Sequence, residues 1–158
     1  NSIWVSTFPV FANALILDAL TKRTLPYFQG YSDFFSEVKV GRSRFDFKLT
    51  FPPNHVYVEV KSVSLVEKGV GRFPDAPTER GVKHVKELME LCAKGYRGAV
   101  VFVSQRSDTQ SITCNDDVDS VFGESLRKAH AKGVELYGMN CKVTPTTISL
   151  NKAVKVVL

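Results

Sequence analysis

The sequence predicts an α/β fold with a mixed central β-sheet flanked by helices. Residues 45–51 and 56–61 alternate apolar and polar side chains with a period of two, as strands with one core face do. The continuous apolar run over residues 99–103 is typical of a strand that is buried on both faces. Apolar residues recur at helical spacing over residues 82–92. Taken in order, the elements read αβββαβ followed by αββ.

The first half of the chain is expected to form a helix and a three-stranded meander. The helix extends from about residue 8 to residue 21, with Thr7 as its cap and Pro9 in its first turn, where proline is tolerated. Short turns join the three strands, which favours antiparallel pairing. These strands are predicted over residues 34–40, 45–51 and 56–61.

The connection over residues 62–80 shows little regular pattern. It contains Gly69, Gly71, Pro74 and Pro77. Connections of this length inside a compact domain are usually functional or mobile. We therefore expect a mobile segment that becomes ordered over a substrate.

The second half is expected to alternate helices and strands. One helix begins at Thr78 and ends at Gly95, and another is capped by Ser120 and ends at Gly133. The strands of this half are predicted over residues 99–103, 134–143 and 148–150.

Length and composition limit the classes of protein to consider. A chain of 158 residues has the size of a single domain, which we assign to residues 1–158. The 21 Lys and Arg exceed the 16 Asp and Glu, and a net charge of +5 permits an anionic partner. The three cysteines form no CxxC pair, which argues against a disulfide framework and a zinc site and suits a reducing cytoplasm. The longest apolar stretch, residues 8–20, is too short and too interrupted to span a bilayer, so no membrane partner is expected.

Three polar residues on the predicted meander form the candidate catalytic site. Asp46 lies between Phe45 and Phe47, while Glu59 and Lys61 are two residues apart and share a strand face. Two carboxylates on adjacent strands would form an oxygen site suited to Mg²⁺ or Mn²⁺. A neighbouring ammonium could orient a water or stabilise a charged transition state. The alternative is that all three lie on a solvated strand face.

Further polar residues are weighed around this group. Glu37, on the first strand, is a candidate third acid, and the alternative is a surface glutamate paired with Lys39 or Arg44. Gln105 follows the buried strand at its exit, where polar groups converge in open α/β sheets. Asn13 is either a satisfied core amide or a residue that faces the site.

Basic residues concentrate around the long connection and the second predicted helix, which favours a phosphate-binding rim. For His84 a solvated helix face is the alternative to a DNA-phosphate contact. Motifs of P-loop, dinucleotide-binding, hydrolase and zinc-protease sites do not occur. The candidate DNA-binding residues are Arg44, Arg72, Arg80, Lys83, His84 and Arg106.

Four segments resemble the sugar fermentation stimulation protein A family, in the family's order and over essentially the whole chain. They are residues 43–47 (SRFDF), 57–63 (YVEVKSV), 73–81 (FPDAPTERG) and 102–108 (FVSQRSD). The resemblance implies a PD-(D/E)xK nuclease-like domain with an αβββαβ core. It also implies that Asp46 and Glu59 hold a divalent metal, that Lys61 is the catalytic lysine and that DNA is the partner. The family's usual N-terminal OB-like domain is expected to be absent from this chain.

These observations predict a metal-dependent DNA phosphodiesterase or nuclease-like domain. The alternative is a DNA-binding regulatory protein of sugar fermentation that retains the nuclease fold without turnover. A third class is a binding module for nucleotides or small anions. A homodimer is considered as a further partner.

Overall fold

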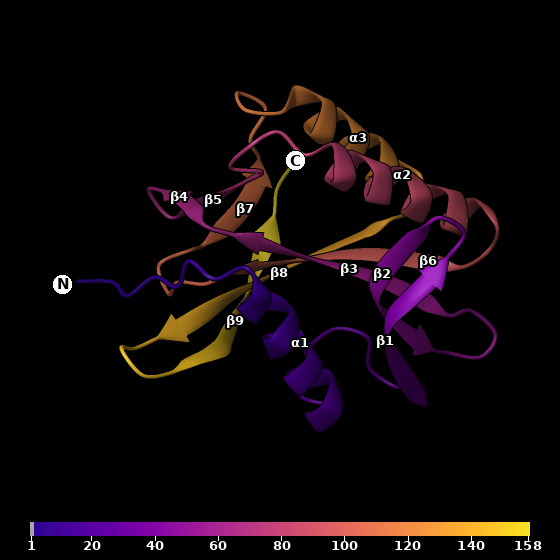
Figure 1. Ribbon diagram of the computed structural model, residues 1–158, viewed down its shortest axis with the longest axis horizontal. Coiled ribbons are helices and arrows are strands. Elements are labelled where there is room, and N and C mark those ends of the chain that lie inside the picture. Colours follow the sequence, from indigo (N-terminus) through magenta and orange to yellow (C-terminus); the bar gives the residue numbers. More distant parts are fainter. Residues whose placement is uncertain (1) are drawn as a thin grey trace.

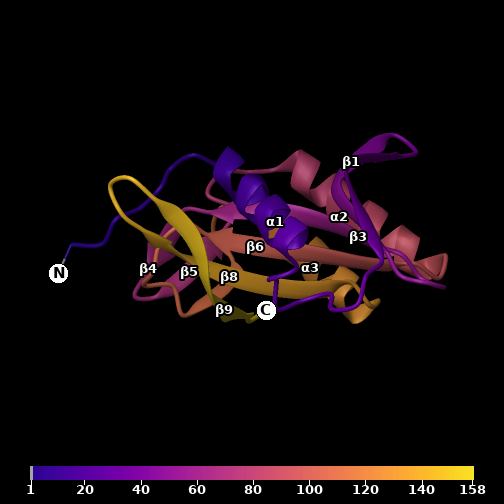
Figure 2. The same cartoon turned by 90° about the horizontal axis from the view of Figure 1, so that it is seen from below.

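A nine-stranded mixed sheet forms the centre of the computed structural model, which describes residues 2–158. Helices α2 and α3 cover one face of the sheet and α1 covers the other (Figure 1). Seen from below, α1 crosses the strands at the middle of the molecule (Figure 2). The helices are α1 (Val10–Lys22), α2 (Glu79–Ala93) and α3 (Ser120–Ala131). The strands are β1 (Asp33–Val40), β2 (Ser43–Thr50), β3 (Val56–Val63), β4 (Leu65–Glu67), β5 (Val70–Phe73), β6 (Arg97–Ser104), β7 (Ser111–Cys114), β8 (Glu135–Val143) and β9 (Ile148–Val156).

The strand order is β1-β2-β3-β6-β8-β9-β7-β5-β4. The antiparallel meander β1–β2–β3 and the parallel pairs β3–β6 and β6–β8 confirm the mixed α/β class. Helix α2 lies on the connection from β3 to β6, after β4 and β5, and α3 lies on the connection from β6 to β8, after β7. Both crossovers move along the sheet in the same direction, and because such crossovers are right-handed, both helices lie on the same face.

The expectation of an irregular connection over residues 62–80 is wrong, because residues 65–73 form a β-hairpin. Lys68 and Gly69 form a two-residue turn between β4 and β5, with φ of 49° and 81°. Such turns match the twist of paired strands, which explains a hairpin this short. Strand β5 also pairs with β7, and the Phe73 ring contacts Phe102 and Phe122. The segment is therefore tied to the sheet and to the core.

Several boundaries also differ from the expectation. Strand β9 extends to Val156 rather than ending at residue 150, because it pairs with β8 and then with β7, a strand that the sequence pattern did not predict. Pro9 rather than Thr7 precedes α1, and Asp119 rather than Ser120 caps α3. The predicted start of α2 at Thr78 is confirmed, since the Thr78 hydroxyl caps the helix by accepting a hydrogen bond from the Gly81 amide.

Strand β3 is buried on both faces rather than polar on one. Val58 and Val60 pack in the apolar cluster under α1, while Tyr57 and Val63 pack in the cluster under α2 and α3. Glu59 shares the phase of Tyr57, so its carboxylate lies beneath α2 with only 4% of the residue exposed. Over residues 2–158, none of the helices has the length and apolar character needed to cross a membrane.

Asp119 joins the N-termini of α2 and α3. Its carboxylate accepts hydrogen bonds from the amides of Phe122 (2.9 Å) and Thr78 (2.8 Å). We expect Asp119→Ala to lower the free energy of unfolding by about 2 kcal/mol, as the sum of a lost cap and a lost hydrogen bond. Asp119→Asn keeps one acceptor oxygen and should lose about half as much. Urea denaturation measures both.

Asp117 is the matched control, since it is exposed in the turn before α3. Asp117→Ala should change the stability by less than about 0.5 kcal/mol. Equal stability of the Asp119→Ala and Asp117→Ala proteins would contradict a linking role for Asp119.

Candidate active site

The site begins where the pairing of β2 with its neighbours is interrupted. The β2–β3 register runs from Leu49 paired with Val56 to Phe47 paired with Val58, and it ends there. On the other side of β2, Glu37 of β1 has a φ of 55° opposite Asp46. A residue other than glycine in this conformation marks a local break in regular strand geometry. Asp46 thus lies where the ladders on both sides of β2 are interrupted.

The Asp46 carboxylate replaces the main-chain acceptor that the Val60 amide of β3 lacks where the β2–β3 pairing ends. Its Oδ2 accepts a hydrogen bond from the Val60 amide at 2.7 Å, so β3 loses no donor when β2 diverges. Its Oδ1 accepts a hydrogen bond from Asn13 Nδ2 of α1 at 2.8 Å. Asn13 therefore faces the site, which decides between the two alternatives left by the sequence.

Glu59 is held by two cationic or polar neighbours and retains one free oxygen. Its Oε1 lies 2.7 Å from His84 Nδ1 and 3.2 Å from Lys61 Nζ. Because an ionised carboxylate only accepts, both nitrogens are the donors. Its Oε2 is buried and has no hydrogen-bond partner within the described part of the chain. Buried polar atoms of this kind are rare and mark places where a ligand or ion completes the structure.

The two carboxylates differ in their tendency to ionise. Burial raises the pKa of Asp46, and the nearby charge of Glu59 raises it further. Burial also opposes the ionisation of Glu59, but the hydrogen bond from His84 and the charge of Lys61 outweigh it and hold the pKa of Glu59 below its ordinary value. Glu59 is thus the more readily ionised acid.

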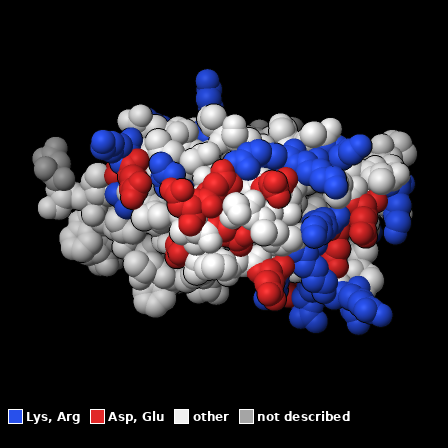
Figure 3. Space-filling model, turned by 90° about the horizontal axis from the view of Figure 1, so that it is seen from above, with Lys and Arg blue, Asp and Glu red and all other residues white. Residues whose placement is uncertain are grey.

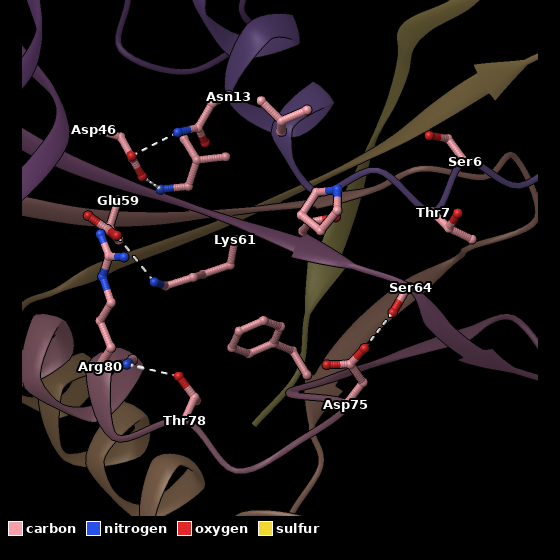
Figure 4. A pocket seen from close by; sticks show the side chains of 16 residues that line it. Ser6, Thr7, Asn13, Asp46, Glu59, Lys61, Ser64, Asp75, Thr78 and Arg80 are labelled. Carbon is pink, nitrogen blue, oxygen red and sulfur yellow. Dashed lines mark hydrogen bonds and ion pairs between the residues drawn. The ribbon is translucent and has the colours of Figure 1, made fainter.

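A cleft of about 680 Å³ opens over these residues. Asn13 points from α1 towards Asp46, Glu59 and Lys61 extend from β3, and Arg80 rises from the start of α2 towards them (Figure 4). The cleft is bounded on one side by the strands β2 and β3 and on the other by the first turn of α2. It therefore brings two carboxylates, an ammonium and a guanidinium to one place.

A second pocket of about 490 Å³ adjoins this cleft through Arg80. It lies between the β1–β2 turn and the first turns of α2, and Lys83 Nζ donates to the Arg42 carbonyl at 3.5 Å across it. On the face that carries α2 and α3, Lys and Arg side chains gather in bands with Asp and Glu between them (Figure 3). The residues that line the second pocket are Arg42, Ser43, Arg44, Glu79, Arg80, Lys83 and His84.

The outer acid and amide of the predicted site lie outside the cleft. Glu37 is exposed and contacts Arg44 at 3.5 Å, so the surface alternative holds for it. Gln105 is buried behind the cleft, where its Nε2 donates to the Phe8 carbonyl (2.8 Å) and to the hydroxyl of Ser62 (3.0 Å). Through Ser62, which lines the cleft, Gln105 supports the wall rather than the interior.

The basic rim expected from the sequence is divided by the fold. Arg80, Lys83 and Arg44 line the second pocket, whereas Arg72 pairs with Glu67 on the β4–β5 hairpin. Arg106 forms a two-bond ion pair with Asp108, at 2.6 and 2.7 Å. The structure therefore brings three of these five cations together at the second pocket and pairs the other two with acids elsewhere.

His84 does not lie on a solvated helix face, which was the alternative to a DNA-phosphate contact. It is only 4% exposed, because the helical stripe of α2 that faces the sheet includes His84, Val85 and Leu88. The signal in the sequence was its spacing, since His84 lies four residues before the core residue Leu88. No pattern in the sequence marks Arg42 and Ser43 as residues that line a pocket. The sequence therefore did not predict the second pocket.

Comparison with known proteins places the chain among relatives of one kind. A sequence model described as "Sugar fermentation stimulation protein RE domain" matches residues 10–147. A sugar fermentation stimulation protein homolog of Desulforamulus reducens is 40% identical over 158 residues, which cover 100% of this chain and 66% of that protein. The homolog of Moorella thermoacetica is 44% identical, with 100% and 68% covered. The chain spans about two thirds of the length of these relatives.

A solved structure shows the same fold. The structure of Pyrococcus furiosus SfsA in complex with Ca²⁺ superimposes with a TM-score of 0.87 and 26% sequence identity. The match covers 94% of this chain and 65% of that one.

The raised pKa of Asp46 predicts how an Asp46→Asn variant responds to pH. The folded protein holds the Asp46 proton more tightly than the unfolded chain, whose ordinary value is 3.8. The corresponding stability is present below that value and is lost as the pH rises through the higher folded value. Asparagine stays neutral, so Asp46→Asn should gain stability relative to wild type as the pH rises above the ordinary value of 3.8 and through the higher folded value. Urea denaturation in the presence of a chelator measures the difference at each pH.

Asp117→Asn, on the exposed turn before α3, serves as the control and should follow wild type throughout. If the stability of Asp46→Asn relative to wild type fell as the pH rose, the assigned direction of the Asp46 pKa would be wrong.

Proposed function

The chain belongs to the sugar fermentation stimulation protein family, and from this and the geometry of the cleft we propose that it is a divalent-metal-dependent DNA phosphodiesterase. The proposed architecture is that of the PD-(D/E)xK nucleases, with Asp46 and Glu59 as the two acids and Lys61 as the lysine of the motif. The activity, the substrate and the DNA partner are all parts of this proposal.

The free oxygen of Glu59 is the observation that carries it. An ionised carboxylate that is 4% exposed, with one oxygen unpartnered over residues 2–158, lies in the same cleft as a second carboxylate. Hard oxygen donors of this kind are the ligands that Mg²⁺, Mn²⁺ and Ca²⁺ prefer. The donor set therefore fits a divalent cation, and the Ca²⁺ complex of the Pyrococcus furiosus relative supports the same chemistry.

Asp46 and Glu59 would hold Mg²⁺ or Mn²⁺ in this proposal, each from a fixed position. Asn13 and the Val60 amide orient the Asp46 carboxylate, and His84 orients that of Glu59. Groups that are held in place before the substrate arrives need no reorganisation during the reaction. When bound, the cation would supply Lewis acidity towards a phosphate and a water.

Lys61 and Arg80 supply the positive charge on the protein side. The Lys61 side chain is only 14% exposed, and its ammonium lies 3.2 Å from Glu59 Oε1, where it can donate a hydrogen bond to an attacking water. The Arg80 guanidinium points into the cleft from α2 and can bind two phosphate oxygens at once (Figure 4). Both charges would stabilise the extra negative charge of the transition state.

Three free cysteines support a reducing compartment, and the cytoplasm is the proposed location. Cys114 and Cys141 are buried, and burial raises their thiol pKa values to about 11 and about 12. Thiols that stay protonated are poor nucleophiles, so the proposed chemistry assigns them no role.

Lys61→Ala tests the chemical step. DNA cleavage should fall roughly 10²-fold or more, because one positioned electrostatic or acid–base group is removed. Metal binding should persist through Asp46 and Glu59. A cleavage screen over duplex, single-stranded and branched DNA with Mg²⁺ and Mn²⁺ measures the rates, and calorimetry measures metal binding.

Asp46→Ala should lose metal binding and cleavage together, while Lys39→Ala, on the exposed face of β1, should match wild type. Cleavage that persists in the Lys61 and Asp46 variants would mean that the activity comes from elsewhere. A wild-type protein that binds DNA without cutting any of the forms would instead be a DNA-binding regulator.

A charge-reversal pair, Arg80→Glu with Lys83→Glu, tests the DNA-binding surface. Affinity should fall similarly for unrelated sequences, because phosphate contacts carry no base information. The slope of log affinity against log salt is negative, and its magnitude should decrease by about 0.9 for each lost duplex phosphate contact. Fluorescence anisotropy with two unrelated duplexes measures both effects.

Lys128→Glu with Lys132→Glu is the matched control, because both lysines are exposed near the end of α3, away from the cleft. An equal loss in both double variants would show that net charge, rather than the cleft rim, controls binding.

A further inference from the structure

The second pocket adjoins the catalytic cleft without containing either of its proposed metal ligands. Glu59 lines the first cleft and His84 lines the second pocket, and these two side chains are 2.7 Å apart. Arg80 lines both. A group bound in the second pocket would therefore lie next to the reacting centre but separated from it by the Glu59–His84 pair.

Ser43 shows that this pocket is built for a polar ligand. The residue is 4% exposed, and its Oγ is buried without a hydrogen-bond partner within residues 2–158. A buried hydroxyl without a partner destabilises the fold, so its presence on the lining points to an absent acceptor or donor. The hydroxyl rotates about a single bond, and turning towards a ligand requires no movement of β2.

The charge of the pocket selects an anion. Arg42, Arg44, Arg80 and Lys83 line it, against the single lining acid Glu79. Acids outside the lining engage two of these cations only at long range, with Arg44 at 3.5 Å from Glu37 and Lys83 at 3.9 Å from Glu87. These contacts are partly exposed and weak, so the cations remain available. Several arginines around one space are typical of phosphate recognition, because each guanidinium matches two phosphate oxygens.

We propose that the second pocket is a subsite for a phosphate of the nucleic acid other than the one that is cleaved. The assignment of the ligand as a nucleic acid rests on the proposed function, whereas the anion chemistry rests on the pocket alone. Successive phosphates of one strand advance by about 3.4 Å along a duplex axis, so a strand held at the cleft presents its next phosphates to the neighbouring pocket. The subsite would fix the position and direction of the strand relative to Asp46 and Glu59.

The phosphate in the second pocket can be a terminal phosphate or an internal phosphodiester of the strand. Binding of short thymidine oligonucleotides, measured in the presence of a chelator, distinguishes the two. The probes are the dinucleotide without a terminal phosphate, the dinucleotide with a 5′-phosphate, the dinucleotide with a 3′-phosphate, and the unphosphorylated trinucleotide. Wild type should bind at least one of the last three about tenfold more tightly than the first, as expected for a new charge-assisted contact. A preference for a terminal phosphate would identify recognition of strand ends, and a preference for the trinucleotide would identify an internal phosphodiester.

Ser43→Ala and Arg42→Ala should each remove most of this preference, and the Ser43→Ala protein should be at least as stable as wild type. Lys61→Ala, which changes the first cleft, and Ser149→Ala, on exposed β9, should retain the preference. Absence of any preference in wild type, or its persistence in both the Ser43 and Arg42 variants, would overturn the subsite. Cleavage is measured in a separate experiment. A phosphate preference without cleavage would refute the proposed nuclease activity but not the subsite. Cleavage without a phosphate preference would refute the subsite but not the nuclease activity.

Discussion

The hydrogen bond from the Val60 amide to the Asp46 carboxylate is the interaction on which the site depends. Strand β3 is fully paired with β6 on one side, but on the other its pairing with β2 ends at Phe47. A buried amide without an acceptor would be costly, and the Asp46 carboxylate removes that cost at 2.7 Å. Strand β2 can therefore diverge from β3, and the space between them becomes the cleft. The Asp46 side chain thus permits the strands to separate and also lines the cleft between them.

The same opening accounts for the electrostatics of the site. Burial in the partly desolvated cleft raises the pKa of Asp46, and repulsion by the Glu59 carboxylate raises it further. His84 and Lys61 relieve it on the side of Glu59, and Asn13 and Val60 hold Asp46 without adding charge. A divalent cation between the two acids would remove the remaining repulsion. The repulsion between the two carboxylates lowers the stability of the metal-free protein, as is common at sites that bind a ligand.

The sequence alone predicts the mixed sheet, the meander and the two crossover helices, because period-two and helical patterns depend on local burial. It also selects Asp46, Glu59 and Lys61, since their strands have clear apolar partners. The β4–β5 hairpin and β7 could not be predicted, because strands of three or four residues have too few alternations to read and are stabilised by pairing with distant segments. The contact between His84 and Glu59 joins residues that are 25 apart in the chain, so the helical spacing that indicates the burial of His84 does not identify its partner. The break in β1 at Glu37, where φ is 55°, also leaves no pattern in the sequence.

In the proposed function, Asp46 and Glu59 together hold a divalent cation in the opening between β2 and β3. Anomalous diffraction from a crystal of the protein soaked in Mn²⁺ locates such a cation. We expect a manganese peak within bonding distance of one oxygen of each carboxylate, with the Val60 amide still bound to Asp46. A peak elsewhere in the molecule, with the cleft carboxylates in their metal-free positions, would contradict it.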